Sequence, residues 1–129
     1  MDKTITIDGR EITFRATART PRLYRMLTGR DMITDMSKLR KSFIKAQKNK
    51  KKENDEDVSG TFGGLSTSDL IIFEDSAYVM ARHANPEIKQ QTPDDWLDTF
   101  NMFDIFDILP EIMDLWNLNN ATTSEPKKK

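Results

Sequence analysis

Residues 3–17, KTITIDGREITFRAT, contain two short segments in which apolar and polar side chains alternate on either side of an Asp8-Gly9 dipeptide. Alternation with a period of two is typical of strands, and Asp-Gly suits the two-residue turn of a β-hairpin. The stretch therefore predicts a hairpin with one apolar face. That face carries Ile5, Ile7, Ile12, Phe14 and Ala16. A lone hairpin is marginally stable in water, so helices from the rest of the chain must cover it.

The residues after the hairpin predict two helices. Thr20-Pro21 is typical of a helix start, because a capping hydroxyl precedes a proline, and Gly29 is typical of a helix end. Asp31 can cap the second helix. Its apolar stripe holds Met32, Ile33, Met36, Leu39, Phe43 and Ile44, and its other face holds Lys38, Arg40, Lys41, Lys45 and Lys48.

Residues 48–64, KNKKKENDEDVSGTFGG, are almost all charged or small. Such a stretch buries too little apolar surface to order itself, so we expect a flexible insertion inside one domain. Ser66 or Thr67 then caps a helix with a broad apolar surface, which is typical of a central, buried helix. That helix is expected to end at Asn85-Pro86.

The last third of the chain starts a helix again at Thr92-Pro93 and continues with apolar residues at helical spacing to Trp116. Pro110 should kink or divide this run. The sequence thus predicts an α+β fold that is mostly α, with the N-terminal hairpin followed by about four to five helices. One domain spans residues 1–118, with a disordered loop near 48–64 and a disordered tail at 119–129.

Formal charge is distributed very unevenly along the chain. The net charge of −1 is composed of +10 over residues 1–52, −14 over 53–126 and +3 at Lys127, Lys128 and Lys129. Such asymmetry suggests a basic partner surface, an acidic partner surface, or two halves that dock on each other. Self-association through the opposite charges is one possible outcome.

The sequence lacks the residue combinations of the common catalytic and metal sites. The 129 residues include no cysteine and one histidine, His83, so there is no thiolate site and no histidine cluster. Near a helix C-terminus, His83 is expected to be a cation favoured by the helix dipole. We therefore expect no enzyme activity, cofactor or metal, no membrane span, and a cytosolic protein.

Two stretches suggest binding instead. Residues 38–52 hold eight Lys or Arg and no acid, which would suit nucleic acid phosphates, although a solvated helix face is the commoner explanation. Residues 96–116 hold two Trp, three Phe and two Met among many acids. Most of these belong in a core, yet Met and Phe also line adaptable grooves that hold apolar helices.

Three segments resemble a known family. They are DGREITFRATARTPRLYRMLTGRDM near the start, FEDSAYVMARHANP in the middle and WLDTFNMFDIFDILPEIMDLWNLN near the end. Their order resembles that of the small tail assembly chaperones of long-tailed phages of Gram-positive bacteria. The resemblance covers roughly residues 3–118, except for the break at 48–64.

The resemblance implies a binding function and no catalysis. Members of this family bind the long, helical tape measure protein, keep its apolar segments soluble and help to bring tail tube protein to it. They act in the cytoplasm of the bacterial host and are absent from the mature virion. In many such phages a frameshifted longer form is thought to bind the tube protein, and the Lys127–Lys129 ending is compatible with a slippery codon run.

The residues and the resemblance together predict a groove or coiled-coil contact with the tape measure protein. The predicted contact residues are Trp96, Phe100, Phe103, Phe106 and Trp116. Asp104 and Asp107 would form an acidic rim that favours basic, amphipathic partners. The alternative is a small phage nucleic-acid-binding regulator that uses the basic stretch 38–52.

Overall fold

The computed structural model describes residues 1–53, 65–102 and 104–124 and begins with the predicted β-hairpin. Strands β1 (Asp2–Ile7) and β2 (Arg10–Arg15) pair antiparallel, with Ile5 opposite Ile12 and Thr4 opposite Thr13. Asp8 and Gly9 both have positive φ, 53° and 78°, as a type I′ turn requires. The apolar face is buried, and the other face carries a hydrogen bond of 2.8 Å between the hydroxyls of Thr4 and Thr13.

Helices α1 (Thr20–Thr28) and α2 (Met32–Glu53) follow the hairpin as predicted, with one difference at the start of α1. Thr20 is the first helical residue and not its cap, because its hydroxyl accepts a hydrogen bond from the backbone N–H of Thr17. Gly29 ends α1 at φ 77°, and its N–H donates to the carbonyl of Arg25. The carboxylate of Asp31 caps α2 by accepting from the N–H of Ile33.

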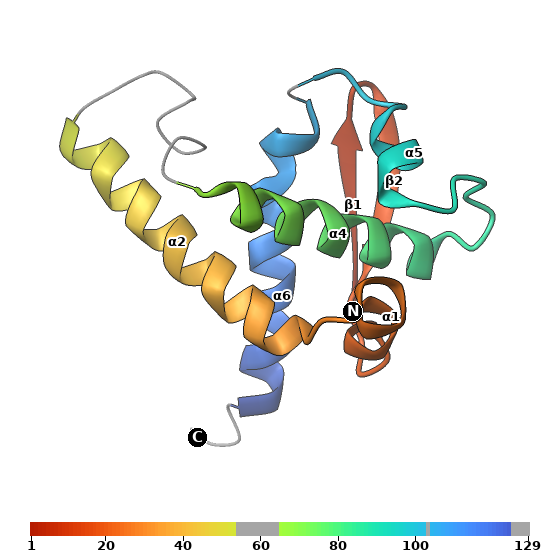
Figure 1. Ribbon diagram of the computed structural model, residues 1–129, viewed down its shortest axis with the longest axis horizontal. Helices are drawn as coiled ribbons and strands as arrows, with labels where there is room; N and C mark the ends of the chain where they lie inside the picture. The colour runs from red at the N-terminus through yellow and green to blue at the C-terminus, as the bar shows by residue number, and fades with distance from the viewer. Residues whose placement is uncertain (54–64, 103, 125–129) are drawn as a thin grey trace.

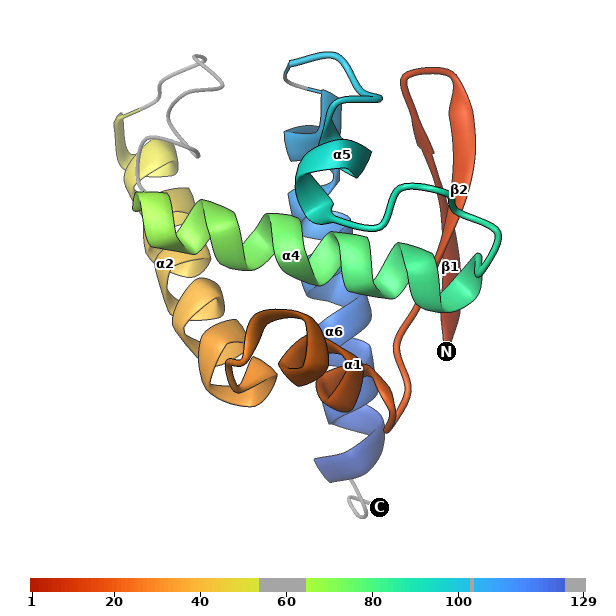
Figure 2. The ribbon, with the colours of Figure 1, turned by 45° about the vertical axis from the view of Figure 1, so that its right-hand side comes forward.

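Helix α4 (Thr67–Ala84) is the central helix of the fold. It crosses the middle of the molecule in front of α6 and contacts β2, α1, α2 and α5 (Figures 1 and 2). Ser66 and Asp69 form a reciprocal capping box at its start. Most of its apolar residues are buried, which confirms the prediction of a central helix.

The C-terminal elements are shorter than the apolar pattern predicted. Helix α5 (Pro93–Leu97) begins at the Thr92 cap, but the chain turns away before the 3₁₀-helix η1 (Asp104–Ile108). In this turn the side-chain amide of Asn101 donates to the carboxylate of Asp8 in the hairpin, at 3.0 Å. This contact joins the turn to the hairpin. Helix α6 (Leu109–Ser124) then begins beside Pro110, which divides the run as predicted.

One hydrophobic cluster joins both strands and all the helices. The fold class is therefore the predicted one: in the part of the chain that the structure describes, a hairpin is followed by five α-helices and one 3₁₀-helix around a shared core. Helix α2 reaches Glu53, inside the predicted break at 48–64, and α6 reaches Ser124, inside the predicted tail at 119–129. The remainders, 54–64 and 125–129, lie outside the described residues. Among the helices that are described, none combines the length and the apolar character needed to cross a bilayer.

Candidate functional site

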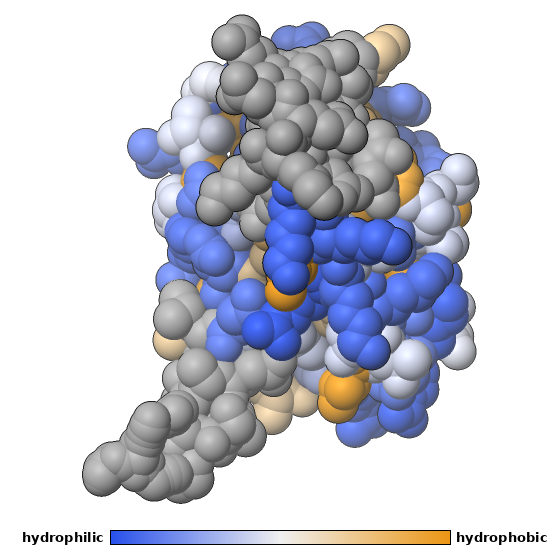
Figure 3. Space-filling view, turned by 90° about the vertical axis from the view of Figure 1, so that its left-hand side faces the viewer, coloured by the Kyte–Doolittle hydropathy of each residue, from blue (hydrophilic) through white to orange (hydrophobic). Residues whose placement is uncertain are grey.

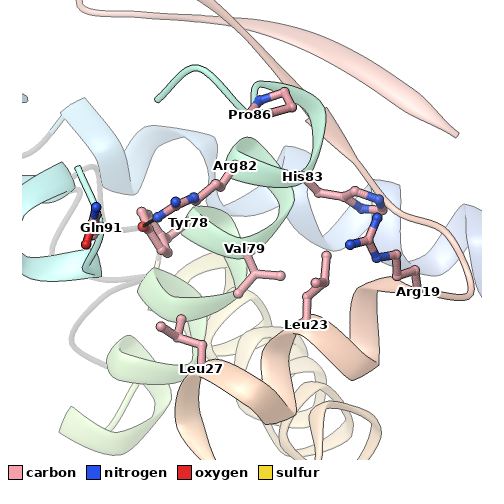
Figure 4. A pocket seen from close by; sticks show the side chains of 9 residues that line it. All are labelled: Arg19, Leu23, Leu27, Tyr78, Val79, Arg82, His83, Pro86 and Gln91. Carbon is pink, nitrogen blue, oxygen red and sulfur yellow. Dashed lines mark hydrogen bonds between the residues drawn. The ribbon is translucent and has the colours of Figure 1, made fainter. Parts of the chain in front are cut away.

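An open groove of about 320 Å³ lies between α1 and α4; we call it the α1/α4 groove (Figure 4). Its floor and walls are mainly apolar, and its rim is basic. The groove is lined by Arg19, Leu23, Leu27, Tyr78, Val79, Arg82, His83, Pro86 and Gln91. Sequence reasoning missed this site, because an apolar period in the helix after Thr20-Pro21 does not show which of its apolar residues stay uncovered.

The packing of α1 on α4 leaves part of the apolar face of α1 uncovered, whereas Val79 and Tyr78 of α4 are buried. Tyr24 points into the core and is fully buried, whereas its neighbour Leu23 is half-buried and Leu27 is 38% exposed. Leu23 and Leu27 are one helical turn apart, so both line the same side of the groove. Val79 of α4 forms the facing wall (Figure 4). The groove thus has apolar surface that no described residue covers completely.

Arg82 and Tyr78 are held in place on one side of the groove. A guanidinium nitrogen of Arg82 donates to the Tyr78 hydroxyl at 2.7 Å and to the backbone carbonyl of Gln90 at 3.3 Å. The Tyr78 hydroxyl also donates to that carbonyl, at 2.7 Å. All of these acceptors are uncharged, so the positive charge of Arg82 is not neutralised by them.

Arg19 and His83 lie side by side at the other end of the groove (Figure 4). Nδ1 of His83 is 3.5 Å from the Thr20 hydroxyl oxygen. Partial burial lowers the pKa of His83, and the cationic groups of Arg15 and Arg19 lower it further. His83 occupies the last turn of α4 as predicted, and burial and these cations oppose the protonated form that the helix dipole favours.

A polar cluster beside the groove fixes the relative positions of α1, α2 and α4. Arg30 donates to the carboxylate of Asp35 at 2.8 Å, to that of Asp75 at 2.9 Å and to the Tyr24 hydroxyl at 2.8 Å. The Tyr24 hydroxyl in turn donates to Asp35 at 2.7 Å. Burial raises the pKa of Asp75, and the nearby Arg30 guanidinium opposes that rise. The cluster therefore links α1, α2 and α4 and contributes to the structure of the fold.

The predicted basic face of α2 is present and exposed; we call it the α2 basic face. It comprises Lys38, Arg40, Lys41, Lys45 and Lys48. Figure 3 views the molecule from the α2 side, and hydrophilic residues cover most of the described surface there. Lys38 is engaged, because its Nζ donates to the Ser68 hydroxyl at 2.6 Å and lies 3.7 Å from a carboxylate oxygen of Asp69.

The aromatic residues predicted to contact a partner are mostly packed inside the molecule. Trp96 is 3% exposed and Trp116 is 7% exposed. Phe100 is half-buried, with its ring edge-on to Trp96 and the Arg10 guanidinium 4.2 Å from its centroid. Phe106 is half-buried against Phe73. The two tryptophans therefore form core in this structure and offer almost no surface to a partner.

The remaining predicted contact residues are Phe103, Asp104 and Asp107. Phe103 lies outside the described residues. Asp104 is half-buried and accepts a hydrogen bond from Asn101, whereas Asp107 is exposed on η1. Neither lines the α1/α4 groove, whose charged rim is basic. The acidic rim expected around the aromatic residues of 96–116 stays a prediction, and the α1/α4 groove is a separate site with a basic rim.

Within residues 1–53, 65–102 and 104–124, no group of three or more His, Cys, Asp or Glu side chains is placed to hold a metal ion. Comparison of the chain with protein-family models, with curated proteins and with solved structures finds no match in any of the three.

Proposed function

We propose that this protein is a phage tail assembly chaperone, which binds helical segments of the tape measure protein and helps to recruit tail tube subunits. The α1/α4 groove is the docking site in this proposal. Burial of apolar side chains in such a groove stabilises a complex by about 25 cal/mol per Å² of apolar surface removed from water. This is a binding function, and it requires no catalytic group.

The proposal rests on the sequence segments to which the groove residues belong. Leu23 and Leu27 belong to the segment TPRLYRMLTGRD, and Tyr78, Val79 and His83 belong to FEDSAYVMARHANP. These are two of the three segments on which the family resemblance rests. The fold brings them together at a groove in which Leu23 and Leu27 keep exposed apolar surface, as a chaperone for apolar helices needs.

The rest of the proposal follows from the resemblance. The protein acts in the cytoplasm of the infected or lysogenic host and does not enter the mature virion. A frameshifted longer product would add the segment that binds the tube protein. Sequencing of the gene and its neighbours tests this part directly. An overlapping second frame after about codon 120, followed by a very long helical reading frame, is the expected arrangement.

Co-expression with the protein of that long neighbouring reading frame tests binding. The tape measure protein should be soluble and co-purify with this chain, and Leu27→Asp should abolish both effects. Met26→Asp is the matched control, because Met26 is the neighbouring residue on α1, is 73% exposed and does not line the groove. If the tape measure protein is insoluble with the wild-type chain, or if both variants act alike, the proposal fails.

The α2 basic face favours one alternative, a small phage nucleic-acid-binding regulator. Its exposed Lys and Arg side chains suit phosphate contacts, although no described aromatic residue is interleaved with them except buried Phe43. Phosphate binding weakens steeply as salt rises, whereas binding in an apolar groove does not. A salt titration with a duplex DNA probe therefore separates the two functions.

A further inference from the structure

The charges around the α1/α4 groove restrict the partner that it can accept. None of the nine described lining residues is acidic, and three of them are Arg19, Arg82 and His83. The Arg19 guanidinium has no ion-pair partner within the part of the chain that the structure describes. Arg82 donates only to uncharged oxygens. The groove therefore has two guanidinium charges that no carboxylate neutralises.

The spacing of the lining residues matches the spacing of a helix. Leu23 and Leu27 are four residues apart on α1, and Val79 and His83 are four residues apart on α4. Each pair spans about one helical turn, roughly 5.4 Å along its axis. Side chains of a third helix repeat at the same interval, so its apolar residues can pack on the exposed parts of Leu23 and Leu27, beside α4.

The two guanidinium groups lie toward opposite ends of this apolar strip. In Figure 4, Arg19, with His83 beside it, lies near the start of α1, whereas Arg82 extends the other way, toward Gln91. A helix lying over Leu23 would thus meet a guanidinium toward each end of its contact. Acidic side chains on that helix would pair with these groups, and basic side chains would be repelled.

We propose that the α1/α4 groove binds an amphipathic helix whose apolar stripe is flanked by carboxylates. The inference rests on the proposed function only in naming the tape measure protein as the source of that helix. It reverses the charge preference that the acidic C-terminal residues suggested. Acid-flanked segments of the tape measure protein are its expected clients, and base-flanked segments are not.

Two designed peptides of about 20 residues test the charge preference, because they share a leucine stripe and differ only in flanking Glu or Lys. Fluorescence anisotropy with the full chain measures both affinities. We expect the Glu peptide to bind at least about tenfold more tightly than the Lys peptide at low salt, and less so at high salt. Equal affinities, tighter binding of the Lys peptide, or no binding of the Glu peptide would overturn the proposal.

Charge reversal within α1 tests the location. Arg19→Glu should weaken binding of the Glu peptide by about tenfold and strengthen binding of the Lys peptide. Arg22→Glu is the matched control, because Arg22 is exposed on the same helix and does not line the groove. The helix dipole stabilises an acidic side chain near the N-terminus of a helix, so both variants should fold. Thermal unfolding measures whether they do. Equal losses in the two variants would contradict the proposed location.

Two further measurements keep the outcomes distinct. A dimer that persists at high salt and that Leu27→Asp dissociates would show that a second copy fills the groove, which would overturn the proposal. Tape measure protein that stays soluble with the Arg19→Glu variant would retain the chaperone function and reject the charge preference. Selective binding of the Glu peptide without solubilisation of the tape measure protein would support the charge preference and reject the chaperone function.

Discussion

Arg30 is the residue that links the most separate parts of the fold. It follows the left-handed Gly29 and reaches Asp35 on α2, Asp75 on α4 and the hydroxyl of Tyr24 on α1. Asp75 is largely buried, with 15% of its side chain exposed. Removal of the guanidinium would leave a buried carboxylate without its cation. The free energy of unfolding then falls by more than the intact pair contributes to it, because the unpaired charge stays buried.

Arg30→Met should therefore destabilise the protein by about 1–3 kcal/mol. The expected loss is below that of a fully buried pair, because 40% of the Arg30 side chain is exposed and solvent screens its charge. Urea unfolding monitored by circular dichroism measures the change. Arg22→Met is the control, since Arg22 is exposed. A loss equal to that of the control would show that the cluster contributes nothing to stability.

His83 makes stability depend on pH near neutrality. Its folded pKa lies below the value of 6.5 expected in the unfolded chain, because of burial and the cations of Arg15 and Arg19. Asp2, which also lies near, is paired with Arg15 and opposes the shift only in part. The unfolded state thus binds the proton more readily. This contribution to stability is present above the unfolded pKa and is lost as pH falls through the folded pKa.

His83→Gln should flatten this dependence between about pH 5 and pH 7. Glu74 and Asp75 have folded pKa values raised, chiefly by burial, so their contributions have the opposite sign and decline as pH rises. Both remain in the variant, so the difference between wild type and variant isolates His83. Thermal midpoints measured across this range provide the comparison. Parallel curves for the two proteins would show that His83 titrates alike in both states.

At the scale of single elements, the end of α1 depends on backbone geometry. Gly29 has φ 77°, and an added Cβ would meet no atom within 4 Å. The cost of a side chain there is therefore conformational strain and not a clash. Gly29→Ala should lower stability by about 1 kcal/mol, and Gly29→Asn by less, because Asn tolerates the left-handed region. Chemical unfolding of both variants is the test, and equal stability of Ala and Asn would contradict this explanation.

Elements specified by local signals were predictable from the sequence. Asp8-Gly9 specifies the hairpin turn, and Gly29 and Pro110 mark helix boundaries within one turn of the residues concerned. The break after Leu97 was not predictable. The Asn101 side chain donates to Asp8, 93 residues away in the chain, and no local pattern reveals such a contact. The apolar residues keep a helical period through this segment, although the described backbone between Leu97 and Asp104 is not helical.

The candidate site was harder to predict than the elements that form it. Apolar periodicity shows that Trp96 and Leu27 belong to apolar faces, but it does not show which face a neighbouring element covers. In the structure Trp96 packs on Tyr78 and is buried, whereas Leu27 lies at an uncovered junction of α1 and α4. Trp96 was the more obvious candidate for a partner contact because it is large and aromatic, but Leu27 is the residue that is exposed.

At the scale of the whole molecule, the uneven charge along the sequence is partly neutralised by folding. Among the described residues, three ion pairs join the basic residues 1–52 to later acids: Lys3 with Glu111, Arg30 with Asp75 and Lys38 with Asp69. Other described charges lie on opposite sides of the fold. The α2 basic face lies at one side of the fold, and α5, whose Asp94 and Asp95 are exposed, lies toward the other (Figure 1).

This arrangement predicts weak self-association that depends on salt. The α2 basic face of one copy can approach the acidic α5 of another, and such a head-to-tail contact builds rings or open chains of copies. Sedimentation velocity should show larger species at about 0.01 M salt, where the Debye length is about 30 Å, and monomers at about 0.3 M salt. Charge reversal at Lys41 and Lys45 should remove the larger species, whereas Leu27→Asp should leave them unchanged. Monomers at both salt concentrations would show that the opposed faces are too dilute in charge to attract, and association that survives high salt would point to an apolar contact instead.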